Sequence, residues 1–249
     1  METVEDTPQG LAGPSRAPLV PFPALQEAVF LARPNRFTAR VRLAGREVAA
    51  FVPDSGRLPD LLVAGRRVFL RPAPGPGRRT GYDLLLVDHD GVLVSVDSRL
   101  PNRVFARALQ AGLLPELQGY TEVRREVGLP GGRLDFVLGG DGLVPCAVEV
   151  KSVTLVRAGV ALFPDAPTAR GRRHVLELLR LRRAGWRAVV CFMILRADAL
   201  SFAPHGAEDR AFARALREAA AGGVEVRAFT CRVTVAGVDL GDEVPVLLW

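Results

Sequence analysis

The chain has 249 residues, with 33 Lys and Arg against 27 Asp and Glu, which gives a formal charge of +6 and a pI near 10.1. Its length allows one large domain or two smaller ones, and its apolar content is ample for a core. No apolar run is long enough to span a bilayer, which excludes a membrane-spanning helix. The basic balance favours a polyanionic partner, because a basic surface gains affinity for phosphates through counterion release.

Residues 1–18 are rich in Pro, Gly and small polar side chains, and they predict a loose N-terminal tail rather than a secretory signal. Residues 19–80 contain short alternating runs separated by turn residues such as Ala44-Gly45. This texture predicts a small β-barrel of the oligonucleotide-binding (OB) type, which uses basic and aromatic side chains on its face. Its few aromatic residues are equally compatible with a core role. The expected strands cover residues 37–43, 47–52 and 67–70.

Residues 81–249 have a mixed α/β pattern. Asp90-Gly91 between two apolar runs predicts a hairpin, and Asn102 followed by residues 103–111 predicts a capped helix that stops at Gly112. The continuous apolar run 186–195 is typical of a buried central strand. Further strands are expected at 84–87, 92–96, 121–129, 133–138, 144–153 and 224–235, and further helices at 168–183 and 208–221.

Cys146, Cys191 and Cys231 each lie in an apolar, strand-like run. Their odd number and their surroundings predict buried thiols in a reducing cytoplasm rather than a disulfide frame or a zinc site. The three histidines are too dispersed for a zinc pattern, which leaves the role of His174 open.

Lys151 is the single lysine among the 33 basic residues. A lysine offers a compact, rotatable ammonium group, and the planar guanidinium of arginine replaces it poorly where a point charge must orient a water or touch an oxyanion. This contrast indicates a catalytic lysine, although a lone surface lysine would give the same count.

Glu149 and Lys151 lie two residues apart on an expected strand, so their side chains share a face, and Asp135 on the preceding strand can lie opposite them. Two neighbouring carboxylates are best reconciled by a divalent cation such as Mg²⁺ or Mn²⁺, with Glu126 as a third candidate ligand. Lys151 would then help to orient a water for attack on a phosphodiester. The competing interpretation is a solvated sheet face with cross-strand ion pairs.

Several motifs in fixed order resemble the sugar fermentation stimulation protein A family over residues 19–246. They are Pro34-Asn35-Arg36-Phe37, Pro53-Asp54-Ser55-Gly56-Arg57-Leu58, Asp97-Ser98-Arg99-Leu100-Pro101-Asn102, Arg133-Leu134-Asp135-Phe136, residues 148–155 and residues 163–171. The resemblance implies an OB-type barrel followed by a PD-(D/E)xK nuclease-like domain, and a DNA-binding role linked to sugar metabolism genes.

The resemblance also implies Asp135 and Glu149 as metal ligands and Lys151 as the catalytic lysine. Asp165 and Arg170, in a further family motif, either line the site or anchor the following helix. The family more often has a histidine where this chain has Phe51 and a serine where it has Gly132. Neither departure touches the three central residues.

We therefore expect a cytoplasmic DNA-binding protein with an Mg²⁺- or Mn²⁺-dependent phosphodiester-cleaving site. The first alternative keeps the fold but makes the protein a DNA-binding regulator of sugar metabolism genes with an inactive or structural site. The second is a metal-dependent enzyme that acts on a small phosphorylated metabolite. The expected nucleic-acid contacts are Arg36, Arg40, Arg57, Arg79, Arg133 and Arg170.

Overall fold

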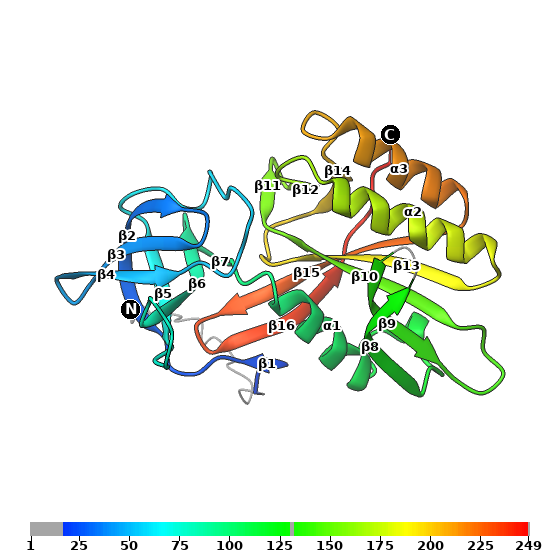
Figure 1. Cartoon of the computed structure of the whole chain (residues 1–249), viewed down its shortest axis with the longest axis horizontal. Coiled ribbons are helices and arrows are strands. Elements are labelled where there is room, and N and C mark those ends of the chain that lie inside the picture. Colours follow the sequence, from blue (N-terminus) through cyan, green and yellow to red (C-terminus); the bar gives the residue numbers. More distant parts are fainter. Residues whose placement is uncertain (1–16, 130–131, 249) are drawn as a thin grey trace, which may run out of the picture.

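The computed structural model describes residues 17–129 and 132–248, so most of the expected N-terminal tail lies outside the described residues. Within them, the chain forms a β-barrel and a larger α/β domain (Figure 1). The barrel sheet has the strand order β4-β3-β2-β5-β6-β7, and β4 also pairs with β6, which closes it. Its strands are β2 (Gln26–Asn35), β3 (Thr38–Leu43), β4 (Arg46–Phe51), β5 (Arg67–Pro72), β6 (Tyr82–His89) and β7 (Val92–Ser95).

The barrel therefore extends to Ser95, and the boundary expected at residue 80 is wrong. The apolar run of β6 suggested the α/β domain because this strand is buried along most of its length, like a central strand of an α/β sheet. The two expected hairpin turns are confirmed. Ala44 and Gly45 have φ of 46° and 79°, and Asp90 and Gly91 have 55° and 90°, the left-handed backbone that tight hairpins require.

The larger domain is built on a sheet with the strand order β1-β16-β15-β13-β10-β9-β8. Strands β10, β13 and β15 run parallel in its centre, and β9 joins β10 antiparallel. The strands are β1 (Val20–Pro21), β8 (Glu122–Leu129), β9 (Gly132–Gly139), β10 (Cys146–Val153), β13 (Arg187–Ile194), β15 (Glu225–Thr234) and β16 (Gly237–Glu243). A small sheet beside it contains β11 (Leu155–Arg157), β12 (Val160–Phe163) and β14 (Ser201–Pro204).

Helices cover both faces of the larger sheet (Figure 1). One core packs α2 (Ala169–Arg183) and α3 (Arg210–Ala221) against side chains such as Ala147 and Phe192, and the other packs α1 (Leu100–Gln110) against side chains such as Phe136 and Val148. Because successive strand residues point to opposite faces, one strand supplies both cores. A short 3₁₀ helix, η1 (Pro115–Leu117), follows α1.

The first turns of α2 and α1 begin in different ways. Thr168 begins α2, and its hydroxyl accepts the Gly171 N–H at 3.0 Å, as expected of a capping residue. Asn102 does not cap α1, because the helix already begins at Leu100 with Pro101 in its first turn. The asparagine side chain is instead free to reach a neighbouring strand. Gly112 follows α1 with φ of 67°, consistent with the expected stop.

All three cysteines are buried and unpaired, as predicted. No helix within the described part of the chain has the length and apolarity needed to cross a membrane.

Candidate functional site

Asp135 lies where strands β9 and β10 stop pairing through their backbones. Their register runs from Cys146–Leu138 to Val148–Phe136, so the expected antiparallel pairing next to Glu149 is confirmed. Beyond that point, Asp135 Oδ2 accepts the Val150 N–H at 2.8 Å. Asp135 Oδ1 accepts a hydrogen bond from Asn102 Nδ2 of α1 at 2.9 Å. Donors from a strand and a helix thus hold this carboxylate in place.

Glu149 is buried, with only 2% of its surface exposed. Its Oε1 contacts both Lys151 Nζ and His174 Nδ1. Its Oε2 is also buried but has no hydrogen-bond partner among the described residues. A buried carboxylate oxygen without a donor is costly, because it has lost water and gained nothing in return. The site therefore presents an unused anionic ligand.

The two carboxyl groups differ in their pKa. Burial, and then the charge of Glu149, raise the pKa of Asp135 above its usual value, and the bonds from Val150 and Asn102 oppose this only in part. Burial acts in the same direction on Glu149. There the hydrogen bond from His174 and the charge of Lys151 outweigh it, so the pKa of Glu149 lies below its usual value. Two neighbouring carboxylates that disfavour joint ionisation form a setting in which a cation binds well.

His174 joins this site, although its sequence surroundings left its role open. It lies on α2, four residues after Arg170, whose Nε donates to His174 Nε2 at 3.4 Å. In the tautomer whose Nε2 accepts this bond, Nδ1 carries the proton and donates to Glu149. His174 Nδ1 also lies 3.4 Å from Lys151 Nζ. The i, i+4 spacing of Arg170 and His174 was the available signal, but it did not indicate which strand the helix would face.

Glu126, the third candidate ligand, is not brought into this group. Its carboxylate forms an ion pair with Arg133 Nε at 2.7 Å, and half of its side chain is exposed. Within the described ranges, no group of three or more His, Cys, Asp or Glu side chains is arranged to hold a metal. Asp135 and Glu149 would leave further coordination positions to water or substrate, as Mg²⁺ commonly does. A ligand role for Glu126 stays a prediction.

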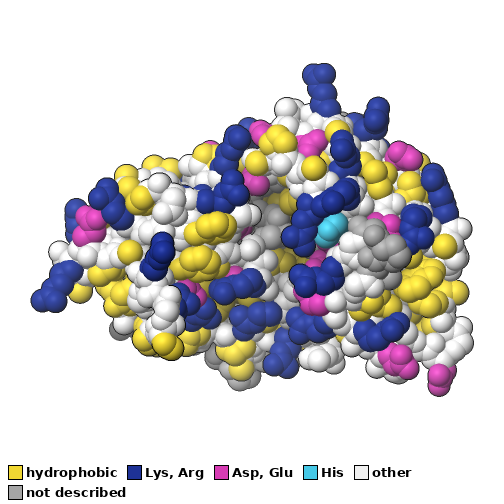
Figure 2. All heavy atoms as spheres, in the orientation of Figure 1, with side chains coloured by type: hydrophobic (Ala, Val, Ile, Leu, Met, Phe, Trp, Pro, Cys, Tyr) yellow, Lys and Arg dark blue, Asp and Glu magenta, His cyan; other side chains and the backbone are white. Residues whose placement is uncertain are grey.

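The arginines expected to contact nucleic acid lie in different settings. Arg36 and Arg57 line a groove beside the barrel, and Arg79 lies on the loop before β6. The other three are engaged with protein groups: Arg40 with Glu47 at 3.3 Å, Arg133 with Glu126, and Arg170 with His174. Figure 2 shows Lys and Arg side chains gathered around the hollow in the middle of this face. Their contact with nucleic acid stays a prediction.

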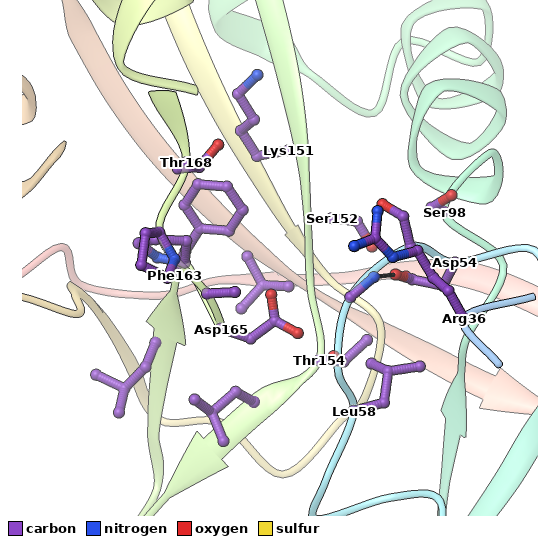
Figure 3. A pocket seen from close by; sticks show the side chains of 18 of the residues that line it. Arg36, Asp54, Leu58, Ser98, Lys151, Ser152, Thr154, Phe163, Asp165 and Thr168 are labelled. Atoms are coloured by element: carbon purple, nitrogen blue, oxygen red, sulfur yellow. Dashed lines mark hydrogen bonds between the residues drawn. The ribbon is translucent and has the colours of Figure 1, made fainter. Parts of the chain in front are cut away.

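A cleft of about 440 Å³ lies between the barrel and the larger domain. One wall is the barrel loop at residues 54–58, and the other comes from β10 and the segment that follows β12. Lys151 and Thr168 lie toward one end, and Asp54 and Asp165 lie farther along (Figure 3). The cleft therefore leads directly to the lysine beside Glu149. Asp165 lines it, and Asp209 rather than Asp165 accepts the Thr168 N–H at the start of α2.

Residues 99–237 match the family model described as the sugar fermentation stimulation protein RE domain, and residues 31–96 match the SfsA N-terminal OB domain. The sugar fermentation stimulation protein homolog of Moorella thermoacetica is 52% identical over 224 residues, which cover 89% of this chain and 97% of the relative. The homolog of Chloroflexus aggregans is 49% identical over 232 residues, which cover 92% of this chain and 89% of the relative.

A solved structure is also similar. Pyrococcus furiosus SfsA in complex with Ca²⁺ superposes with a TM-score of 0.86 at 32% identity, covering 94% of this chain and all of that one. These matches confirm the predicted fold, an OB-type barrel followed by a restriction-endonuclease-like α/β domain.

Proposed function

Because the chain belongs to the sugar fermentation stimulation protein family, we propose that its restriction-endonuclease-like domain cleaves DNA phosphodiester bonds with Mg²⁺ or Mn²⁺. The observation that carries the proposal is the buried, unpartnered Oε2 of Glu149, in a site shared with the carboxylate of Asp135. A divalent cation satisfies such an oxygen and offsets the repulsion between the two acids. The Ca²⁺ complex of the Pyrococcus relative supports a divalent ion in this family.

Asp135 and Glu149 would hold the cation, which supplies positive charge that stabilises the transition state of phosphodiester cleavage. The protein contributes by fixing both ligands in advance. Asn102 and the Val150 N–H orient Asp135, and His174 and Lys151 orient Glu149. Ligands that are already oriented need no rearrangement when substrate arrives, which favours catalysis.

Lys151 contributes a mobile ammonium at the end of the cleft. Its side chain is mostly buried and pairs with Glu149. From there it donates hydrogen bonds to a phosphate oxygen or to the attacking water. His174 packs beside it and keeps the lysine and Glu149 together.

The barrel would hold the DNA. OB folds bind nucleic acid strands with basic and aromatic side chains, and Arg36 and Arg57 line the groove next to the cleft. Phe37 is exposed and stacks on Phe51, with 6.2 Å between the ring centroids, which places an aromatic surface on the same barrel. A strand that crosses this surface enters the cleft toward Lys151.

The test is cleavage of end-labelled single- and double-stranded DNA by the purified full-length chain with Mg²⁺ or Mn²⁺. Asp135→Asn and Glu149→Gln should each lower the rate by roughly a hundredfold or more, the scale expected when a positioned catalytic group is lost. Asp141→Asn is the matched control, since this exposed carboxylate lies on the turn between β9 and β10 and should leave the rate unchanged.

The other outcomes separate the alternatives. DNA binding without cleavage under any condition would favour a regulator with an inactive site. Equal cleavage by the parent and both site variants would mean that the site is wrong or that a contaminant cuts. Failure to bind DNA, together with hydrolysis of a small phosphate ester, would favour an enzyme of phosphorylated metabolites.

A further inference from the structure

Asp54 and Asp165 converge in the part of the cleft beyond Lys151 (Figure 3). Asp54 lies in the barrel loop and Asp165 in the segment after β12, so each domain supplies one carboxylate. Gly56 lies between them. A Cβ at Gly56 would come within 2.6 Å of Asp165 Oδ2 and 2.9 Å of Asp54 Oδ1. The approach of the two acids thus depends on a glycine at this position.

Both carboxylates keep unused capacity to accept hydrogen bonds. Asp54 Oδ1 accepts the Gly56 N–H at 2.6 Å, but within residues 17–129 and 132–248 no donor reaches Asp54 Oδ2 or either oxygen of Asp165. The nearby Arg33 does not neutralise them through an ion pair. Its terminal nitrogens donate to the backbone carbonyls of Arg36, Asp54, Gly56 and Arg57. Arg33 therefore braces the loop and leaves the acids open to a ligand.

The rest of the cleft combines apolar and polar surface. Phe163, Leu58 and Pro167 give it apolar surface, and the buried Ser152 Oγ has no hydrogen-bond partner among the described residues. Its volume of about 440 Å³ falls in the size range of small-molecule pockets, about 300–1,000 Å³. Apolar surface combined with a few unsatisfied polar atoms is typical of a binding pocket.

The chemistry of the pocket selects among ligands. Of the charged groups that line this part of the cleft, Asp54 and Asp165 repel a phosphate and Arg36 attracts one, so a phosphate gains little there. The oxygens of Asp54 and Asp165 face the open cleft and can bind water, unlike the buried Glu149 Oε2, so they do not call for a second cation. Unpaired carboxylate oxygens instead fit N–H donors on a flat ring. Guanine offers two adjacent N–H groups on one edge and matches a carboxylate with two parallel bonds, whereas the other bases place an acceptor beside their donor.

We propose that the cleft is a base pocket that binds a guanine of the strand being cut, with Asp165 as the bidentate acceptor and Asp54 as a second acceptor. This inference rests on the proposed function, because the strand is placed by the site at Lys151. The base must be unstacked to enter, so the pocket favours single-stranded or locally opened DNA. Asp54 and Asp165 are specificity-determining residues in this account.

The test measures binding without chemistry, on the full-length chain in EDTA. Calorimetry compares GMP with TMP, and fluorescence anisotropy compares a labelled T8 oligonucleotide with the same 8-mer carrying one central guanine. The guanine ligand of each pair should bind roughly tenfold or more tightly, the scale of one good bidentate contact. Asp165→Asn should erase this preference, because an amide has one acceptor oxygen and its NH₂ group would face the second N–H of the guanine, and Gly56→Ala should weaken it by displacing the acid. Asp141→Asn, on an exposed turn, is the matched control and should keep it.

Equal binding within both pairs, or an unchanged preference in Asp165→Asn, would overturn the base pocket. The proposed function fails separately. Cleavage of both oligonucleotides at equal rates, with no preference in binding, would leave the nuclease standing and remove the pocket. A guanine preference in binding without cleavage in Mg²⁺ or Mn²⁺ would keep the pocket and remove the nuclease.

Discussion

Asp54→Asn should make the protein more stable at neutral and alkaline pH. Burial raises the pKa of Asp54 from its usual 3.8 to about 6, with the charge of Asp165 adding to the effect and the Gly56 N–H opposing it. The difference of about two units corresponds to at most roughly 3 kcal/mol, at 1.36 kcal/mol per unit. This is an upper bound, because the carboxylate borders an open cleft.

The sign follows from where the proton binds. The folded chain holds the Asp54 proton more tightly than the unfolded chain, so its contribution to stability is fully present below pH 3.8 and is lost as the pH rises through about 6. Asparagine carries no charge at any pH and still offers a carbonyl oxygen to the Gly56 N–H. The free energy of unfolding of the variant should therefore rise relative to that of the parent between pH 4.5 and pH 8.

Urea denaturation at pH 4.5, 6 and 8 gives the free energy of unfolding of both proteins. The difference between them should grow by 1 to 3 kcal/mol across this range, on the scale of the pKa change. Asp141→Asn, on an exposed turn, should show no such trend. A difference that is independent of pH, or one that favours the parent at pH 8, would refute this reasoning.

Four further substitutions have definite expected outcomes. Lys151→Arg should lower cleavage by roughly a hundredfold while DNA affinity barely changes, because the charge is kept and the compact ammonium is lost; equal rates would make Lys151 an ordinary ion-pair partner. Arg36→Ala and Arg57→Ala should each reduce the slope of log affinity against log salt by about 1, and unchanged slopes would remove them from the DNA contact. Phe136→Ala should cost about 3–5 kcal/mol in urea denaturation, since its buried ring packs 4.9 Å from Phe105 of α1; a loss below 1 kcal/mol would mean that this core repacks.

The hydrophobic periodicity and the turn residues predicted the strands and turns whose sequence pattern is regular. The run at β13 is buried almost throughout, and the hairpin at Asp90-Gly91 follows directly from its turn residues. Strands β1, β2, β11, β12, β14 and β16 were not expected. Strands β11, β12 and β14 have only two or three partly buried residues each, and β16 ends in acidic residues, so none of these four carries a strong alternation. Strand β6 joins the barrel by pairing antiparallel with β5 and closes it on β4, and β7 pairs with β6; no local pattern reports the pairings of β6 with β5 and β4.

The candidate site was predictable as far as strand geometry reaches. Glu149 and Lys151 share a face of β10, as the period of two along a strand requires. Asp135 lies on the neighbouring strand β9, which pairs with β10 in the expected antiparallel direction. The roles of Asn102 and His174 were not predictable. Asn102 looked like a helix cap, and only the packing of α1 on the sheet brings it to Asp135. The position of His174 beside Glu149 depends on which face α2 turns toward β10, and the packing of the whole core sets that face.

Location of a bound Mn²⁺ tests the central claim most directly. Crystals of the full-length chain grown with Mn²⁺ should give an anomalous difference peak at the carboxylates of Asp135 and Glu149, with Glu149 Oε2 as a ligand. The peak should be lost in Asp135→Asn and retained in Asp141→Asn. A peak elsewhere, or no peak at Mn²⁺ concentrations that support cleavage, would contradict the assignment of this site as the metal centre.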